Sequence, residues 1–322
     1  MSSRPLAVSL ASPGLPFPDD GVAFFSFCGR TSVSPDDPRQ IFVGLPPLAN
    51  DAGTIEVWRS STIDGQGERD GIGFVRTREV LFGHLLVEDD SEMEAAAADA
   101  YRRVLSFIAQ SGFPHLLRTW NYFPHINATC NGTDRYQQFC IGRFRALTAI
   151  GYPENLLPAA TAIGTATPGF LVFFIAAREA GEQVENPRQT SAFRYPQQYG
   201  PQSPSFSRAT LKRWNGHNHL YISGTASIVG HASLHAGDTL TQLDEIIANL
   251  GAVIDSANTR ASLSSDSPSS LDLLKVYLRR PDDLPDVRRH LREKLGDSIP
   301  VLYLHGDICR ADLLVEIEGL RT

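Results

Sequence analysis

The sequence lacks any apolar run long enough to cross a membrane. A spanning helix needs about 18 consecutive apolar residues, and the most apolar stretch, Gly169–Ala177, is far shorter and is typical of a buried strand. Residues 1–18 also lack the charged region and continuous apolar core of a signal peptide. We therefore expect a cytoplasmic protein that makes no contact with a membrane.

Positive charge is also in short supply. Lys and Arg number 29 against 36 Asp and Glu, which gives a net charge of −7. A general nucleic-acid binder is usually basic, so we expect no nucleic-acid partner. An acidic small molecule stays compatible with this composition, because it needs only a local basic pocket.

Cysteine is scarce and unpaired in the sequence. The four cysteines, at positions 28, 130, 140 and 309, form no CxxC pair. Their scatter is typical of reduced thiols rather than of a disulfide framework.

Several cofactor and catalytic patterns are missing. No GxSxG motif is present, and the glycines of residues 65–73 lack the strand-to-helix context of a dinucleotide loop. His231 and His235 are four residues apart, but no third ligand follows at a metal-site spacing. Nine histidines and many serines leave a Ser-His-Asp triad open as an alternative.

Hydrophobic periodicity predicts four helices and a series of strands. The helices are expected at Met93–Ser111, Asp134–Ala149, Asp238–Ala257 and Asp283–Leu295. A strand, a long helix, a strand and a shorter helix follow one another in residues 84–147 and again in residues 221–294. This repeat indicates duplication of one α+β module. We expect an α+β fold with mixed sheets packed against helices, and two domains at 1–150 and 151–322.

The last predicted strand, residues 311–319, carries two carboxylates inside an apolar run. Alternation places Glu316 and Glu318 on one face, and Val315 and Ile317 on the other. The pattern alone favours an edge strand with both carboxylates in water. A buried carboxyl would instead have a raised pKa, hold a proton near neutral pH and serve as a general acid.

Two sets of residues resemble known families. Residues 220–224, 273–278 and 315–318 resemble the RidA/YjgF module, a sheet flanked by two helices that usually trimerises. A narrower resemblance covers most of the chain. Its signature loop is Ser191–Ala209, supported by Trp120–Asn127 and Arg135–Arg145, and it is similar to the chorismatases. That resemblance implies two fused RidA/YjgF-like (chorismate mutase-like) modules, with most of the active site in the second.

The resemblance also implies an activity and a product. Chorismatases hydrolyse chorismate to pyruvate and a cyclic acid, and Glu316 matches their catalytic acid. Cys309 lies seven residues before Glu316, and Gly224 follows Ser223. These two residues resemble the branch that makes 3-hydroxybenzoate. A sister branch that makes both 3- and 4-hydroxybenzoate stays open.

The remaining site residues are candidates for binding chorismate, which carries two carboxylates. An arginine fork binds both oxygens of a carboxylate, and Arg143 and Arg208 lie inside the matched motifs. Weaker candidates are Arg135, Arg145 and Arg194. Three tyrosines in the same motifs are candidates for hydrogen bonds to ring oxygens, and each is equally typical of packing: Tyr136, Tyr195 and Tyr199.

Two alternatives to chorismate cleavage remain. One is a RidA-like enamine or imine hydrolase, although no arginine lies near Leu302, where that family's substrate-binding arginine would fall. The other is a module that binds an aromatic acid without catalysis. Because the expected chemistry is acid–base only, we predict no metal and no organic cofactor. Chorismate is the expected partner, and the chain is expected to be a monomer or a small homo-oligomer.

Overall fold

The structure, a computed structural model, describes residues 5–12, 14–48, 53–130, 132–261, 263 and 267–322. A five-stranded sheet, in the order β1-β5-β2-β4-β3, forms the N-terminal part. Its strands are β1 (Ala7–Ala11), β2 (Gly21–Phe27), β3 (Ser32–Val33), β4 (Gln40–Val43) and β5 (Ile55–Arg59).

The second sheet has six strands, in the order β12-β9-β13-β8-β7-β6. They are β6 (Ile63–Arg69), β7 (Ile72–Thr77), β8 (Val80–Val87), β9 (His115–Pro124), β12 (Ala159–Thr165) and β13 (Phe170–Ala177). Its helices are α1 (Met93–Gln110) and α2 (Arg135–Ala149). A short hairpin, β10 (Thr129–Cys130) and β11 (Thr133–Asp134), precedes α2. Asp134 caps α2 by accepting a hydrogen bond from the backbone N–H of Gln137.

The third sheet also has six strands, in the order β14-β15-β16-β21-β19-β20. They are β14 (Glu182–Val184), β15 (Ala209–Trp214), β16 (His217–Thr225), β19 (Leu273–Leu278), β20 (Val301–His305) and β21 (Val315–Arg321). Its helices are α3 (Thr239–Asn258) and α4 (Leu284–Leu295), and a hairpin, β17 (Ile228–Val229) and β18 (Ala232–Ser233), precedes α3. The short 3-10 turns are η2 (Glu154–Leu156), η3 (Ala192–Arg194), η4 (Gln197–Tyr199), η5 (Pro268–Ser270) and η6 (Pro281–Asp283).

The two six-stranded sheets share one topology. In each, the sixth strand along the chain lies between the third and the fourth, and a helix follows both the third and the fourth strand. The predicted α+β fold of two fused modules is confirmed by this repeat. The domain boundary expected at residue 150 stays a prediction, and β12 and β13 lie beyond it and complete the first of these sheets. We propose modules at residues 63–177 and 182–321.

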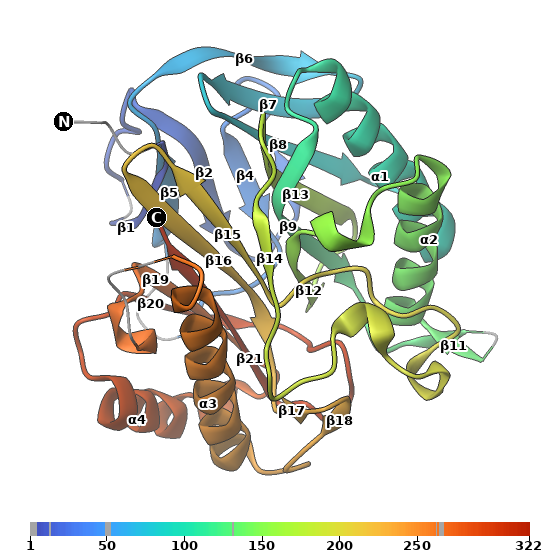
Figure 1. The fold of residues 1–322 in the computed structure, drawn as a ribbon, viewed down its shortest axis with the longest axis vertical. Helices are drawn as coiled ribbons and strands as arrows, with labels where there is room; N and C mark the ends of the chain where they lie inside the picture. Colours follow the sequence, from blue (N-terminus) through green and yellow to red (C-terminus); the bar gives the residue numbers. More distant parts are fainter. Residues whose placement is uncertain (1–4, 13, 49–52, 131, 262, 264–266) are drawn as a thin grey trace.

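The sheets pack around a common core, with the helices outside. In Figure 1, α1 and α2 lie on one side of the molecule and α3 and α4 on another. All eight residues of β13 are buried. Successive residues of β13 alternate between two sides. Phe174 faces the helices α1 and α2, and Phe173 faces the core that the three sheets share. A sheet buried on both faces reads as a continuous apolar run.

The edge-strand interpretation of the last strand is wrong. β21 pairs with β16 on one side and β19 on the other, so it is central. Val315 and Ile317 pack in the core that includes α3 and α4. Glu316 and Glu318 point the other way, toward the second sheet, and are 4% and 0% exposed.

Candidate active site

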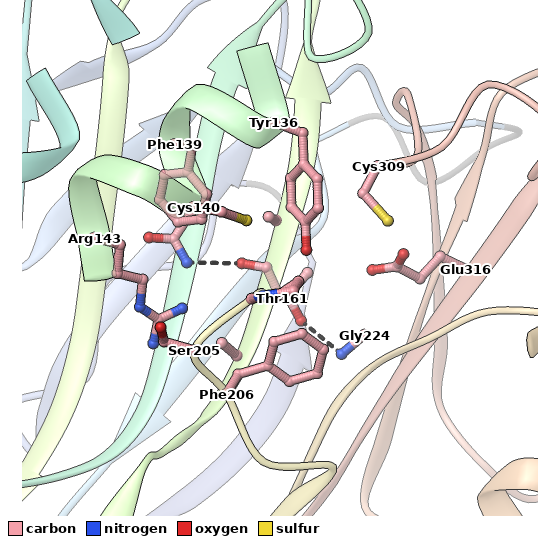
Figure 2. A pocket seen from close by; sticks show the side chains of 14 residues that line it. Tyr136, Phe139, Cys140, Arg143, Thr161, Ser205, Phe206, Gly224, Cys309 and Glu316 are labelled. Atoms are coloured by element: carbon pink, nitrogen blue, oxygen red, sulfur yellow. Dashed lines mark hydrogen bonds between the residues drawn. The ribbon is translucent and has the colours of Figure 1, made fainter. Parts of the chain in front are cut away.

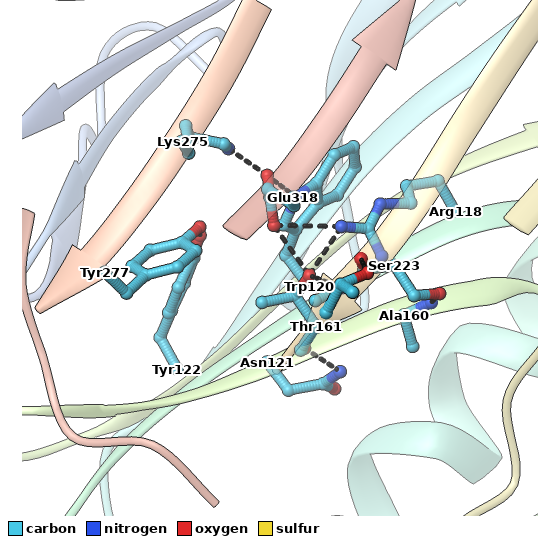
Figure 3. A network of polar contacts seen from close by, with 12 residues as sticks. Arg118, Trp120, Asn121, Tyr122, Ala160, Thr161, Ser223, Lys275, Tyr277 and Glu318 are labelled. Carbon is cyan, nitrogen blue, oxygen red and sulfur yellow. Dashed lines mark hydrogen bonds and ion pairs between the residues drawn. The ribbon is translucent and has the colours of Figure 1, made fainter. Parts of the chain in front are cut away.

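The Glu318 carboxylate is the centre of a buried polar network between the two modules (Figure 3). Arg118 and Trp120 of β9 donate to it over 2.9 and 2.8 Å. Thr161 of β12 donates over 2.6 Å, and the Lys275 ammonium lies 2.8 Å away. Burial would raise the pKa of Glu318, but the charges of Lys275 and Arg118 outweigh it and hold that pKa below its usual value. Glu318 is therefore an ionised, fully partnered residue.

Lys275 extends the network to the N-terminal sheet. Its ammonium lies 3.0 Å from the Glu56 carboxylate, and Glu56 also accepts a hydrogen bond from the Trp58 indole over 2.7 Å. Two cations, Lys275 and Arg118, thus balance two anions, Glu56 and Glu318. The network ties all three sheets together, and these four charges balance one another.

Glu316, two residues earlier on β21, has very different surroundings. Within the described residues, no hydrogen bond or ion pair joins its carboxyl to another side chain, and it faces a cavity. Burial, reinforced by the nearby charge of Glu318, raises the pKa of Glu316 to about 8 against the opposing charges of Arg118 and Arg208. The two carboxyls on one strand face therefore differ in state at neutral pH: Glu318 is ionised and Glu316 holds a proton.

A glycine makes room for the Glu316 carboxyl. The pairing of β16 with β21 is interrupted between Ile222 and Thr225. In this interruption the Gly224 N–H turns to Thr161 Oγ1 over 3.0 Å. A Cβ atom at Gly224 would lie 1.9 Å from Glu316 Oε1. The carboxyl can keep this position only opposite glycine.

The cavity beside Glu316 has two lobes that share one wall. The shared wall contains residues from α2, the signature loop, β16, β21 and the connection between β20 and β21: Tyr136, Pro204, Phe206, Gly224, Glu316 and Cys309. Figure 2 shows Arg143 at one end, Glu316 with Cys309 at the other, and the Tyr136 and Phe206 rings between them. We call the part that reaches Arg143 the inner lobe, and the part that reaches Arg208 and Arg310 the outer lobe.

Arg143 is a buried cation without a carboxylate partner. It is 2% exposed, donates to Thr119 Oγ1 over 3.4 Å and lies over the Tyr101 ring. Its Nε has no hydrogen-bond partner in the described chain, and no ion pair there includes it. Gly142 brings this part of α2 against α1, because a Cβ atom there would lie 2.2 Å from the Glu94 carbonyl oxygen. An isolated buried guanidinium is the arrangement expected of an anion-binding site.

Arg208 brings a second such cation to the outer lobe. It is 5% exposed and donates to the Thr190 carbonyl over 2.9 Å and to the Tyr195 hydroxyl over 2.7 Å. Its Nε is buried with no hydrogen-bond partner among the described residues. Tyr199, in η4 of the same loop, forms a hydrogen bond of 3.2 Å with His231 Nδ1. The loop is therefore an ordered wall of the cavity.

The connection between β20 and β21 positions Cys309, and Arg279 holds that connection. Arg279 donates to the carbonyls of Leu313 and Ile308, each over 2.9 Å, and pairs with Asp307 over 2.6 Å. Burial, followed by the charge of Glu316, raises the pKa of the Cys309 thiol above its ordinary value. Cys309 therefore faces the cavity as a neutral thiol.

All eight of the main predicted site residues line this one cavity. The set comprises Tyr136, Arg143, Tyr195, Tyr199, Arg208, Gly224, Cys309 and Glu316. The three weaker arginine candidates do not line it, and each has a carboxylate partner. Arg135 pairs with Asp90, Arg145 with Glu94 and Arg194 with Glu154.

Comparison with known proteins decides the family. A chorismatase from Streptomyces rapamycinicus is 39% identical over 307 residues, which cover 93% of this chain and 88% of the relative. The chain belongs to the chorismatase family. A 3-hydroxybenzoate synthase from Streptomyces hygroscopicus is 35% identical over 273 residues, which cover 82% of this chain and 80% of that protein.

Family and structure comparisons agree with this chorismatase membership. The family model for the N-terminal part of FkbO/Hyg5-like chorismatases matches residues 56–176, a range that ends at the last strand of the first module. A solved chorismatase crystal structure superposes with a TM-score of 0.93 at 33% identity, and the match covers 100% of both chains.

Two site features of this chorismatase escaped sequence reasoning. Arg310 lines the outer lobe, and the only signal for it was its position directly after Cys309. Thr161 links Glu318 to the Gly224 N–H, and no local pattern marks it. In the described ranges, no group of three His, Cys, Asp or Glu side chains could hold a metal ion. No described helix combines the length and the apolar composition needed to cross a membrane.

Proposed function

We propose that the protein cleaves the enolpyruvyl ether of chorismate and releases pyruvate and 3-hydroxybenzoate. One observation carries this proposal: a buried carboxyl with a raised pKa, Glu316, lies where the two lobes of the cavity meet, and each lobe contains an arginine without a described carboxylate partner. Chorismate is a dianion whose scissile ether lies between its two carboxylates. Family membership and the relatives named chorismatase support the same activity.

The chemistry begins with proton transfer from Glu316 to the terminal carbon of the vinyl ether. This step leaves positive charge on the ether-bearing carbon and negative charge on Glu316. The new carboxylate lies in a site of low polarity, where its attraction to that positive charge is strong. The aromatic rings of Tyr136 and Phe206 line the cavity beside Glu316, where they limit the access of water to the six-membered ring of the substrate.

The product assignment depends on two cavity residues. Cys309 and Gly224 are the two residues in which this chain resembles the 3-hydroxybenzoate branch, and both lie beside Glu316 in the cavity wall. Overall identity does not separate the branches, since the relatives named chorismatase are 39% and 38% identical and the 3-hydroxybenzoate synthase is 35% identical. We propose 3-hydroxybenzoate as the main product, with 4-hydroxybenzoate as a minor one to be measured.

The direct test is incubation of the purified protein with chorismate. Pyruvate would be followed by a coupled assay, and the cyclic acids would be separated by chromatography against authentic standards. We expect 3-hydroxybenzoate as the main cyclic acid, and pyruvate in an amount equal to the sum of 3- and 4-hydroxybenzoate. Pyruvate release no faster than in a sample without protein would refute the proposal.

Activity should depend on pH through Glu316. Its protonated form is the reactive one, so a pKa of about 8 predicts a constant kcat/KM below that pH and a fall above it. Well above the pKa, the decrease should approach tenfold per pH unit, as for any single required proton. The profile would be recorded with chorismate at fixed ionic strength. A rise in kcat/KM through the same interval would contradict the acid role.

Replacing Cys309 with Ala should change the products more than the rate. The thiol lies beside Glu316. No described hydrogen bond joins it to Arg143 or Arg208, the proposed carboxylate-binding arginines. We expect pyruvate release to change by less than about tenfold, within the range of an indirect effect on acid catalysis. Chromatography should reveal changed proportions of the cyclic acids. An unchanged product spectrum would exclude Cys309 from the choice of product.

We also propose that one chain is a complete enzyme. RidA-like modules usually trimerise, whereas here three sheets of one chain share a single core.

A further inference from the structure

Thr161 of β12 connects the Glu318 network to the strand beside the proposed acid. Its hydroxyl donates to Glu318 Oε2 over 2.6 Å. The same oxygen accepts hydrogen bonds from Arg118 Nη2 over 2.5 Å and from the Gly224 N–H over 3.0 Å. A hydroxyl has one hydrogen to donate and two lone pairs that accept, so the protein itself uses all three. Thr161 lines the inner lobe, but its hydroxyl has no hydrogen bond left to offer a ligand.

The Glu318 carboxylate sets the direction of this hydroxyl. Glu318, which its cationic partners keep ionised, can only accept hydrogen bonds. The hydrogen of the Thr161 hydroxyl therefore points toward Glu318, and the lone pairs point toward Arg118 and Gly224. Figure 3 shows Thr161 bonded to both Arg118 and Glu318.

Gly224 is the residue through which Thr161 acts on Glu316. It lies where the pairing of β16 with β21 is interrupted. A Cβ atom at Gly224 would lie 3.3 Å from Thr161 Oγ1 and 1.9 Å from Glu316 Oε1. Glycine has no side chain to hold it, and an N–H withdrawn from the strand ladder needs another partner. Thr161 supplies that partner (Figure 2), so the space that the Glu316 carboxyl occupies stays open.

We infer that Thr161 is a positioning residue for the proposed acid: held by Glu318, it keeps Gly224 in the conformation that leaves room for the Glu316 carboxyl. This inference rests on the proposed function. Thr161 lies in the first module and Glu316 in the second, so the first module takes part in placing the acid. Without the hydroxyl, Gly224 loses its partner and the carboxyl shifts from its place beside the ether, while the arginines of both lobes stay where they are.

Removing the hydroxyl leaves the surrounding bonds in place. Arg118 still pairs with Glu318 over 2.9 Å. Ser223, directly before Gly224, still accepts a hydrogen bond from the Ala160 N–H over 2.8 Å, so β16 stays against β12. The loss therefore falls mainly on the Gly224 N–H.

The experiment uses two pairs of proteins that differ mainly in the hydroxyl: wild type with Thr161→Val, and Thr161→Ser with Thr161→Ala. KM and kcat would be measured for chorismate, and 3-hydroxybenzoate, the proposed product, would be titrated as an inhibitor. We expect Thr161→Val and Thr161→Ala to lower kcat by about tenfold or more, since a slightly misplaced catalytic group can cost about a hundredfold. Thr161→Ser should keep kcat within about threefold of the wild type. KM and the inhibition constant should stay within about threefold in every variant, because substrate binding is unchanged.

Thr210→Val is the matched control. Thr210 is a buried threonine whose Oγ1 accepts a hydrogen bond from the Ala159 N–H of β12 over 2.8 Å, and as described it lines neither lobe. This substitution removes a neighbouring contact with β12 that does not reach Glu316, and kcat should not change.

The role of the Thr161 hydroxyl would be overturned by an unchanged kcat in Thr161→Val, or by a Thr161→Ser variant as slow as Thr161→Ala. A rise in KM and in the inhibition constant as large as the fall in kcat would also overturn it, because the whole cavity would then be altered. If Thr161→Val does not fold, the Ser and Ala variants decide. None of these outcomes affects the proposed function, which only a wild-type protein that releases no pyruvate would overturn, and this inference with it.

Discussion

Replacing Glu316 with Gln should lower the rate of pyruvate release from chorismate by about 10²–10⁴-fold, the usual contribution of a general acid. Gln has nearly the same shape but no transferable proton. Since Glu316 has no described hydrogen-bond partner to lose, the substitution should leave the cavity intact. The rate would be measured with saturating chorismate, and binding with 3-hydroxybenzoate.

Two further measurements make this result specific to Glu316. Affinity for 3-hydroxybenzoate should stay within a few-fold in Glu316→Gln, because the arginines remain. The residual activity should also lose the decline above a pH of about 8, because the group whose pKa sets it is gone. Glu293→Gln on the exposed face of α4 serves as control. Normal turnover in Glu316→Gln would place the acid elsewhere.

Replacing Lys275 with Met should destabilise the protein by roughly 3–5 kcal/mol, the usual cost of removing one partner from a buried ion pair. Lys275 is fully buried between the carboxylates of Glu56 and Glu318. Met fills much of the same space, but it leaves Glu56 without a cationic partner and Glu318 with Arg118 alone. The free energy of unfolding would be measured by urea titration.

A double substitution separates the charge effect from the loss of packing. Adding Glu56→Gln to Lys275→Met removes the anion that has lost its only cationic partner, so part of the lost stability should return. The exposed control Arg213→Met should cost less than about 1 kcal/mol, since its ion pair with Glu182 is largely screened by solvent. A loss below about 1 kcal/mol for Lys275→Met would mean that these carboxylates do not depend on the ammonium.

The sequence predicted the elements better than their arrangement. Helix α1, for example, was expected at Met93–Ser111 and is observed at Met93–Gln110, because its apolar stripe has a clear helical period. The position of β21 was not predictable from alternation. One of its faces packs against an apolar core, and the other meets Arg118 and Lys275, which come from distant parts of the chain. No spacing of residues within β21 indicates these long-range contacts.

The arginines illustrate the same limit at the site. Arg143 and Arg194 both lie in motifs that resemble the chorismatases, and their residue type alone cannot distinguish them. The fold does so, since Arg194 pairs with Glu154 at the surface whereas Arg143 lies buried beside the cavity. Arg310 lies outside those motifs, and its stacking on Tyr199 depends on contact between two distant loops.

The strand β13 bears on which positions of this enzyme tolerate change. It occupies in the first module the place that β21 occupies in the second, yet it contains only Phe, Leu, Val, Ile and Ala. The first module thus contributes Tyr136 and Arg143 to the cavity from α2, and no carboxyl from its central strand. Variation in β13 is therefore limited by packing, whereas variation in β21 is also limited by the surroundings that Glu316 and Glu318 require.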